Sequence, residues 1–279
     1  MPVILGGNTS IYLASLTPPA PVSFLLDTYT NATVAYSLRK LRSAYSGNAI
    51  KVRRSSDNLE QDIGFIGNVL DTASLLTFCG VGNGFVTRWY DQSTNANDCS
   101  NGTIANQAQV VLNGAMITDI YNGKITTVWT LDQYPILTSI PIAQNFIMFA
   151  VVTRAATNST LLPLGSTPQP FFFSWNSLGQ TTSQVTTGLV THASGFTTIG
   201  DYIVSVLRDN SNILKAFRNS TALTTGVSTG TPTTSLRFGF SQGATSSGRI
   251  QEMIFWNNQD LESSQSNMES AINSYYSVF

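Results

Sequence analysis

Most of the chain consists of alternating or continuous apolar runs typical of β-strands, with polar turn residues between them. The run over residues 146–154 is mostly apolar, which indicates a strand buried on both faces of a sheet. Residues 209–211, Asp-Asn-Ser, favour a tight turn and predict a hairpin between their flanking strands. The expected strands cover residues 50–54, 85–90, 125–130, 146–154, 171–175, 202–208, 212–218, 236–240 and 249–256.

Three segments have a helical period instead. Residues 71–76 predict a short helix capped by Asp71. A stripe with spacings of four, three and four predicts an amphipathic helix that ends at Ser46-Gly47; its members are Val34, Leu38, Leu41 and Tyr45. A third stripe follows Asp260 and predicts a C-terminal helix; its members are Leu261, Gln265, Met268, Ile272 and Tyr275.

Closely spaced strands with few helices predict an all-β fold, an antiparallel sandwich of two sheets with three peripheral helices. Residues 1–22 are small, apolar and interrupted by prolines, so we expect an N-terminal arm. No internal repeat and no change of composition divides the rest. We therefore expect a single sandwich domain over residues 23–279.

Charge is unusually sparse in this chain. Only 10% of the residues are charged, whereas soluble domains average about 25%. Ser, Thr and Asn supply the polarity instead, and a hydrophobic content of 42% is ample for a core. A net charge of −1 provides no field to attract phosphate, which argues against a nucleic-acid partner.

The chain start and the cysteines limit where we expect the protein to work. The N-terminus has neither a basic region nor a long apolar stretch, so we expect no signal peptide and synthesis in a cytoplasm. The longest apolar run, residues 146–152, is far below the ~20 residues of a membrane helix, so no membrane partner is expected. Cys79 and Cys99 lack a zinc-site pattern and are expected to be free buried thiols, with a disulfide between them as the alternative.

Short motifs in the first half of the chain occur in a family-specific order. They are residues 35–39 (AYSLR), 43–47 (SAYSG), 52–58 (VRRSSDN), 62–65 (DIGF), 77–79 (TFC), 89–93 (WYDQS) and 95–97 (NAN). This series resembles the N-terminal half of the catalytic domain of fungal α-L-arabinofuranosidase B. Residues 249–257 (RIQEMIFWN), followed by a closing helix, resemble the end of concanavalin A-like lectin and laminin-G sandwiches. Both resemblances imply a concanavalin A-like jelly roll, a module that also occurs in bacteriophage virion proteins.

The resemblance also implies where catalytic carboxylates should lie. The arabinofuranosidase family has a nucleophilic Glu in the middle of the domain and an acid/base Asp in the glycine-rich loop before the last strand. Here no Asp or Glu occurs between Asp132 and Asp201, and the loop over residues 241–248 contains no acid. The vicinal cysteine pair associated with that active site is also missing. We therefore transfer no catalytic residue and expect a protein that is not an enzyme.

Other residues offer weaker chemistry. Asp57, Glu60 and Asp62 share one segment and Asp91 and Asp98 another; we expect them to pair with nearby Arg and Lys, with a calcium site or a hydrolytic pair as alternatives. A catalytic triad would have His192 as its only base, and we expect this histidine to face solvent in a loop. Residues 80–84 are glycine-rich but lack the lysine of a phosphate-binding loop, so they predict a turn. No cofactor is expected.

Carbohydrate binding is the remaining chemistry, because aromatic rings stack on sugar faces while amides bind hydroxyls. The candidates for such a site are Trp129, Tyr134, Trp175, Asn176 and Gln180. Trp89 and Trp256 lie inside expected strands and are predicted to belong to the core.

These observations predict a non-enzymatic virion or surface protein: a lectin-like sandwich that decorates a phage particle or binds host glycan. The expected partners are other virion subunits, reached through the N-terminal arm in a homo-oligomer or particle. The alternatives are a diverged glycoside hydrolase of arabinofuranosidase type with a relocated carboxylate pair, and a shell protein without a ligand. For a hydrolase, Asp57, Asp62 and Asp91 would be the first residues to replace.

Overall fold

The computed structural model describes residues 24–130, 136–154, 171–175, 181–185, 189–192, 198–229, 235–237, 248–258 and 260–279. The arm predicted over residues 1–22 lies outside these ranges. The domain boundary at residue 23 and the role of the arm in assembly therefore stay predictions.

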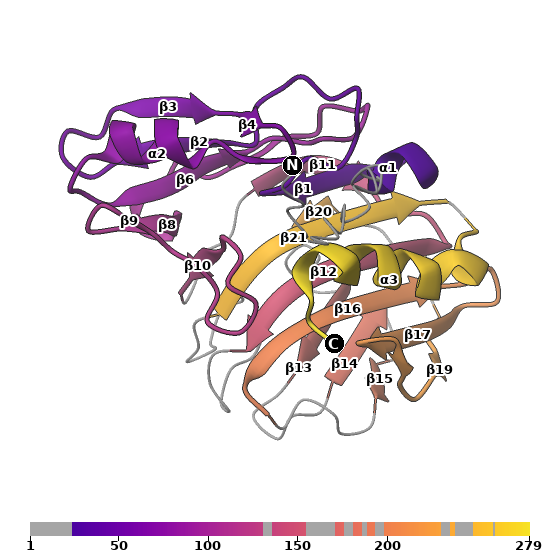
Figure 1. Cartoon of the computed structure of the whole chain (residues 1–279). Coiled ribbons are helices and arrows are strands. Elements are labelled where there is room, and N and C mark those ends of the chain that lie inside the picture. Colours follow the sequence, from indigo (N-terminus) through magenta and orange to yellow (C-terminus); the bar gives the residue numbers. More distant parts are fainter. Residues whose placement is uncertain are drawn as a thin grey trace, which may run out of the picture.

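One antiparallel sheet dominates the described residues (Figure 1). Its strands are β1 (Val34–Ser37), β2 (Ile50–Arg54), β3 (Glu60–Ile63), β6 (Gly84–Trp89), β7 (Cys99–Ser100), β8 (Ala108–Leu112), β9 (Ala115–Met116), β10 (Thr127–Trp129), β11 (Ile136–Pro141), β12 (Phe146–Arg154), β16 (Gly200–Arg208), β17 (Ile213–Arg218), β18 (Thr221–Ala222), β19 (Gly226–Val227), β20 (Ser235–Arg237) and β21 (Gly248–Asn257). The main path runs β18-β17-β16-β12-β21-β10-β8-β6-β7-β11-β20, and β1 also pairs with β21. The long strands β16, β12 and β21 form its centre.

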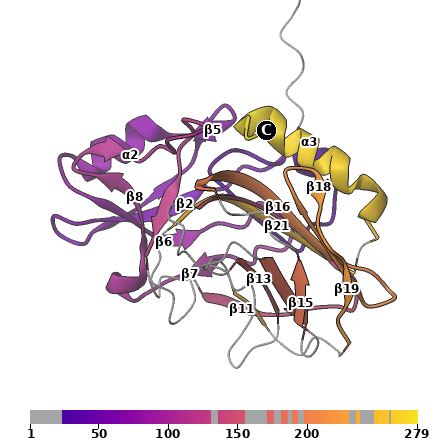
Figure 2. The ribbon, with the colours of Figure 1, turned by 90° about the horizontal axis from the view of Figure 1, so that it is seen from below.

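The remaining elements lie around this sheet. They are β4 (Phe65–Ile66), β5 (Val69–Leu70), the meander β13 (Phe171–Trp175), β14 (Thr181–Val185) and β15 (Leu189–His192), the helices α1 (Leu25–Thr28), α2 (Thr72–Cys79) and α3 (Gln265–Tyr276), and the 3₁₀ turns Ile104–Asn106 and Glu262–Ser264. Helix α3 lies along one face of β16 and β21, and the β13–β15 meander lies on the other side (Figure 2). We call these the outer face and the inner face. The prediction of an all-β, concanavalin A-like antiparallel sandwich with three peripheral helices is confirmed.

Successive residues of β12 point to opposite faces and fill two separate apolar cores. Ile147, Phe149 and Val151 join the outer core, which includes α3. Met148 and Val152 join the larger inner core. Burying one such side chain contributes roughly 1.5–3 kcal/mol, so a strand buried on both faces stabilises both layers at once.

The two helices expected at residues 71–76 and after Asp260 are confirmed. Asp71 caps α2 by accepting a hydrogen bond from the Ser74 N–H, as its position predicted. Helix α2 ends at Gly80, whose φ of 57° is in the left-handed region that favours glycine. The glycine-rich segment that follows is the predicted turn into β6.

The helix expected from Val34, Leu38, Leu41 and Tyr45 is wrong. Residues 34–37 form β1, which pairs with β21 so that Val34 lies opposite Phe255. All four residues of β1 are buried, with Ala35 in the outer core and Tyr36 in the inner core. Tertiary burial on both faces therefore outweighs a local spacing that a helix would also satisfy.

The predictions that both cysteines are free buried thiols and that Trp89 and Trp256 belong to the core are confirmed. Cys79 and Cys99 are free and buried. Trp89 and Trp256 are 1% and 0% exposed. The Trp256 ring packs edge-on against Phe149 with ring centroids 5.9 Å apart, which ties β21 to β12 on the outer face.

Candidate active site

Three polar side chains lie in a row on the outer face, where the central strands β16, β12 and β21 approach one end of the sheet. Thr153 of β12 lies opposite Asp201 of β16 on one side and Arg249 of β21 on the other. Thr153 continues the set formed by Ile147, Phe149 and Val151, so its hydroxyl points to the same face as the outer core. The outer face of β12 is therefore apolar along most of the strand and becomes polar at its last outward-facing residue, Thr153.

A fourth polar side chain, Asp119, reaches this row from the loop between β9 and β10. The loop is a closed turn, because the Asp119 N–H donates to the Lys124 carbonyl and the Gly123 N–H donates to the Asp119 carbonyl. Asp119 Oδ1 accepts the Tyr121 N–H at 2.8 Å, the arrangement of an Asx turn. Asn122 and Gln251 exchange side-chain hydrogen bonds and fasten the turn to β21.

Both carboxyl groups contact a single hydroxyl. Thr153 Oγ1 lies 2.5 Å from Asp119 Oδ2 and 2.8 Å from Asp201 Oδ1. Arg249 Nη1 lies 3.3 Å from Asp119 Oδ2. Asp201 Oδ2 is buried and has no hydrogen-bond partner. We call Asp119, Thr153, Asp201 and Arg249 the carboxyl cluster.

The two carboxyl groups differ in acidity because their surroundings differ. Burial, together with hydrogen bonding and charge repulsion from the adjacent Asp119 carboxyl, raises the pKa of Asp201 to about 7. Burial also acts on Asp119, but the Thr153 hydroxyl, the Tyr121 N–H and Arg249 outweigh it and lower the Asp119 pKa. Below about pH 7 the pair therefore holds one proton, mainly on Asp201, beside an ionised Asp119.

A pocket of about 260 Å³ opens beside the cluster. Asp201 is one of its lining residues; the others are Tyr121, Thr198, Ile199, Gly200, Tyr202, Ser277 and Val278. The pocket thus lies between the loop that contains Asp119, the start of β16 and the residues after α3. A proton-bearing carboxyl at the wall of a pocket is the arrangement expected of a general acid.

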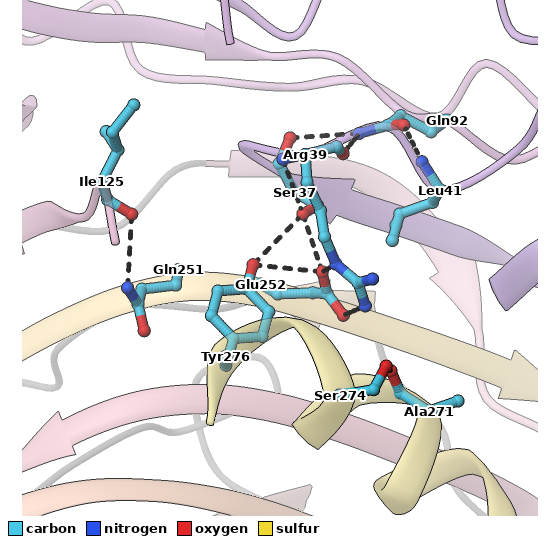
Figure 3. A network of polar contacts seen from close by, with 10 residues as sticks. All are labelled: Ser37, Arg39, Leu41, Gln92, Ile125, Gln251, Glu252, Ala271, Ser274 and Tyr276. Carbon is cyan, nitrogen blue, oxygen red and sulfur yellow. Dashed lines mark hydrogen bonds and ion pairs between the residues drawn. The ribbon is translucent and has the colours of Figure 1, made fainter. Parts of the chain in front are cut away.

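A second polar network lies nearby on the outer face (Figure 3). Glu252 of β21 receives two hydrogen bonds from the buried Arg39, from Nε at 2.7 Å and from Nη2 at 2.9 Å. The hydroxyls of Ser37 and Tyr276 also donate to Glu252, at 2.8 and 3.2 Å. This network joins the segment after β1, strand β21 and helix α3, and both Glu252 oxygens are satisfied.

The predicted carbohydrate-binding residues are only partly within the described chain. Trp129 is 2% exposed, lies in β10, and donates from Nε1 to Thr127 Oγ1 at 2.6 Å. Its expected position outside the core is wrong, because β10 pairs with β21 and buries the ring in the inner core. Trp175 lies at the end of β13. Tyr134, Asn176 and Gln180 lie outside the described residues, so their binding roles stay predictions.

Asp57, Asp62 and Asp98 are found in the expected ion pairs, whereas Asp91 is held by hydrogen bonds instead. Arg54 forms an ion pair with Asp57 at 2.7 Å, and Lys51 pairs with Asp62 at 3.7 Å. Asp91 is buried and accepts the backbone N–H groups of Ala35, Ser93 and Asn97, so its role is to hold the loop over residues 91–97. No group of three or more His, Cys, Asp or Glu in the described segments is arranged to hold a metal ion.

The expectation for His192 is wrong. This histidine lies in β15, is fully buried, and its Nδ1 contacts the Thr224 carbonyl oxygen. Burial lowers its pKa, so the ring is neutral at physiological pH. The prediction failed because β15 pairs with β14 and places the side chain inside the molecule.

Comparison with known proteins places these observations in a family context. Residues 25–130 match the family model "Alpha-L-arabinofuranosidase B, catalytic". A GH54 α-L-arabinofuranosidase soaked with a cyclic sulfate inhibitor is 16% identical with a TM-score of 0.69. An arabinofuranosidase complexed with arabinofuranosyl-α-1,2-xylobiose is 15% identical with a TM-score of 0.70. Each of these alignments covers 90% of this chain but 64% of the other chain, so this chain spans less than two thirds of those proteins.

Two further comparisons define the limits of the likeness. The binding domain of Paraclostridial Mosquitocidal Protein 1 is 10% identical with a TM-score of 0.51, over 82% of this chain and 52% of that one. No curated protein matches the chain in sequence. At identities this low, the structural matches establish a shared fold alone. The matched family segment confirms the resemblance to the catalytic domain of arabinofuranosidase B.

The expectation of a non-enzymatic virion or surface protein is therefore wrong. Both the matched family segment and the arabinofuranosidase structures are those of a glycoside hydrolase catalytic domain, and none of these findings supports a phage particle. The error came from giving two missing carboxylates more weight than the family resemblance. The described part of the chain contains no helix long and apolar enough to cross a membrane. The predicted oligomer and the predicted location stay untested.

Sequence reasoning missed Asp119 and Asp201. Asp201 immediately precedes the apolar strand residues 202–208, and Arg249 precedes the apolar residues of the last strand. Thr153 follows the apolar core of residues 146–152. A polar residue at the end of each of three apolar runs was the available signal, but only the strand order brings the three runs together.

Proposed function

We propose that this protein is a glycoside hydrolase of the arabinofuranosidase type whose chemistry depends on Asp119 and Asp201. The single observation that carries the proposal is that these two carboxyl groups share the Thr153 hydroxyl beside a pocket. Contacts of 2.5 and 2.8 Å to one oxygen, together with hydrogen bonding between the two carboxyls, hold Asp119 and Asp201 side by side as an acid pair that shares a proton. The fold and the matched segment support the reaction class.

In this mechanism the two acids have different roles. Asp201 holds a proton up to about pH 7 and donates it to the oxygen of the leaving group as the glycosidic bond breaks. Asp119 is ionised and stabilises the oxocarbenium-like transition state. A water molecule forms the new bond to the anomeric carbon and gives its proton to Asp119. The Thr153 hydroxyl and Arg249 orient Asp119 and keep its charge in place. This use of one protonated and one ionised carboxyl is the general division of labour in glycoside hydrolysis.

The experiment is a hydrolysis screen with the full chain on a panel of 4-nitrophenyl glycosides that includes the α-L-arabinofuranoside. We expect turnover, and we expect Asp201→Asn to lower kcat/KM by at least about 10²-fold, the usual contribution of a general acid. Asp62→Asn is the matched control, because Asp62 is an exposed acid paired with Lys51 far along the sheet.

Two results would overturn the proposal. One is the absence of turnover on every glycoside by a chain whose circular dichroism shows a folded β protein. The other is turnover that Asp62→Asn abolishes and Asp201→Asn leaves intact, which would assign the chemistry to the acids near β2 and β3.

A further inference from the structure

The mouth of the pocket combines apolar surface with hydroxyl groups. Tyr121 is 49% exposed and Ile199 is 46% exposed, although both are large apolar side chains that line the pocket. Thr198 and Tyr202 also line it, and their hydroxyls lie 2.8 Å apart. Exposed apolar side chains beside polar groups in a concave site are typical of ligand contact surfaces.

The position of Tyr121 relative to the carboxyl cluster is fixed by its backbone. Its N–H donates to Asp119 Oδ1 at 2.8 Å, so the residue that holds the carboxylate also presents its ring to the pocket. Gly123 has a φ of 68° and closes the turn behind it. A ring on a rigid turn loses little entropy when it contacts a ligand, which favours tight stacking.

The charge of the pocket selects among sugars. The described lining residues include no Lys, Arg or His, and Asp201 is the one acidic residue among them. The cation of the carboxyl cluster, Arg249, is already engaged by Asp119. A uronic or sialic acid would therefore bring its carboxylate next to Asp119 and Asp201 with no free positive charge to receive it. A neutral ring brings only hydroxyls and an apolar C–H face.

We propose that Tyr121 is the platform on which a neutral sugar ring stacks, and that the pocket accepts uncharged glycosyl units and rejects acidic ones. This inference rests on the proposed function for its site but concerns binding, not bond cleavage. Ile199 extends the apolar surface on the far side of the pocket, and the Thr198 and Tyr202 hydroxyls bind sugar hydroxyls. Asp201 lines the same pocket.

The test is equilibrium binding by calorimetry with matched methyl glycosides. The neutral probes are methyl α-L-arabinofuranoside and methyl β-D-galactopyranoside, and the acidic probe is methyl β-D-galacturonide, which differs from the galactoside only at C6. We expect at least one neutral probe to bind and the galacturonide to show no saturable binding. Tyr121→Ala should weaken neutral binding about 3–10-fold or more, while Tyr121→Phe stays near wild type, because the ring provides the contact.

The variants separate stacking from structure. Tyr121→Ala keeps the backbone N–H that holds Asp119, so the carboxyl cluster is not disturbed. Ile120→Ala is the matched control, since Ile120 is 72% exposed and does not line the pocket. The inference is overturned if no neutral probe binds, if the galacturonide binds equally well, or if Tyr121→Ala binds like wild type.

Failure of this inference differs from failure of the proposed function. Neutral binding that depends on Tyr121, without turnover of any aryl glycoside, would support the platform and overturn the hydrolase. Turnover that is lost in Asp201→Asn, with a KM that Tyr121→Ala leaves unchanged, would support the hydrolase and overturn the platform.

Discussion

Glu252 and Asp201 are both buried carboxyl groups on the outer face of the same sheet, yet their surroundings are opposite. Glu252 lies opposite Val151 on β12, two residues before Thr153, which lies opposite Asp201. Glu252 receives hydrogen bonds from a guanidinium and two hydroxyls, and both its oxygens are used. Asp201 shares one hydroxyl with a second acid and has an oxygen without a partner.

The difference separates an acid whose partners satisfy its charge from an acid that can hold a proton. A buried charge is tolerated when an opposite charge and hydrogen bonds satisfy it, as in the Arg39–Glu252 pair. When those partners are missing, the group keeps its proton instead, and its pKa moves toward neutrality. Only the second situation supplies a proton at physiological pH, and only Asp201 of these two acids borders a pocket. Three predictions test the contrast.

The largest effect is expected from Glu252→Gln. The amide keeps the size of the side chain but leaves the Arg39 guanidinium, 7% exposed, without a counter-charge. Removing one partner of a buried ion pair costs about 3–5 kcal/mol of unfolding free energy. Urea denaturation of the variant and the wild type measures this difference, and the expected loss comes with little change in hydrolysis per folded molecule.

A surface ion pair serves as the control for that experiment. Asp57→Asn breaks the Arg54–Asp57 pair, which is open to solvent, so we expect a much smaller change in unfolding free energy. A Glu252→Gln protein as stable as the wild type would show that Glu252 does not hold the sheet, the neighbouring segment and α3 together. The contrast between the two acids would then fail on its structural side.

The second prediction concerns pH and Asp201. The pKa of Asp201 is raised to about 7 in the folded chain from its ordinary value of 3.8. Between these values the folded chain holds a proton that the unfolded chain has released, so this group stabilises the fold at low pH and the benefit is lost as pH rises toward 7. From pH 5 to pH 8 we expect the wild type to lose about 2–3 kcal/mol more unfolding free energy than Asp201→Asn.

Other groups near Asp201 have to be distinguished from it. The ionisable groups around the site are Asp119, Arg249, Lys124, Tyr121 and Tyr202. The lowered pKa of Asp119 has the opposite sign, since its stabilisation is lost as pH falls through its folded pKa. Comparing urea denaturation of Asp201→Asn with the wild type at each pH isolates Asp201. Parallel pH profiles of the two proteins would show that Asp201 is ionised in the folded state.

The sequence predicted the elements with strong local signals and missed those defined by distant contacts. The apolar run that becomes β12 and the Asp71 cap were both evident, because burial on two faces and capping are local properties. The segment from Val34 was misassigned because its pairing with β21, more than two hundred residues later, outweighs the local spacing. The carboxyl cluster was hidden for the same reason, since its members come from three strands and a loop. Sequence alone predicted the fold class, but the candidate site required the register.

The smallest effect is expected from Tyr276→Phe, and it tests how completely Glu252 is satisfied. The Tyr276 hydroxyl is the longest of the four hydrogen bonds to this carboxylate, at 3.2 Å, compared with 2.7–2.9 Å for Arg39 and Ser37. Its removal leaves the ring in the outer core and three donors on Glu252, so we expect a loss of about 1 kcal/mol in urea denaturation. If Glu252 instead depended on this hydroxyl as Asp201 depends on Thr153, the loss would approach that of Glu252→Gln. A small loss therefore shows that the other three hydrogen bonds are enough to stabilise the Glu252 carboxylate, whereas Asp201 Oδ2 has no hydrogen-bond donor.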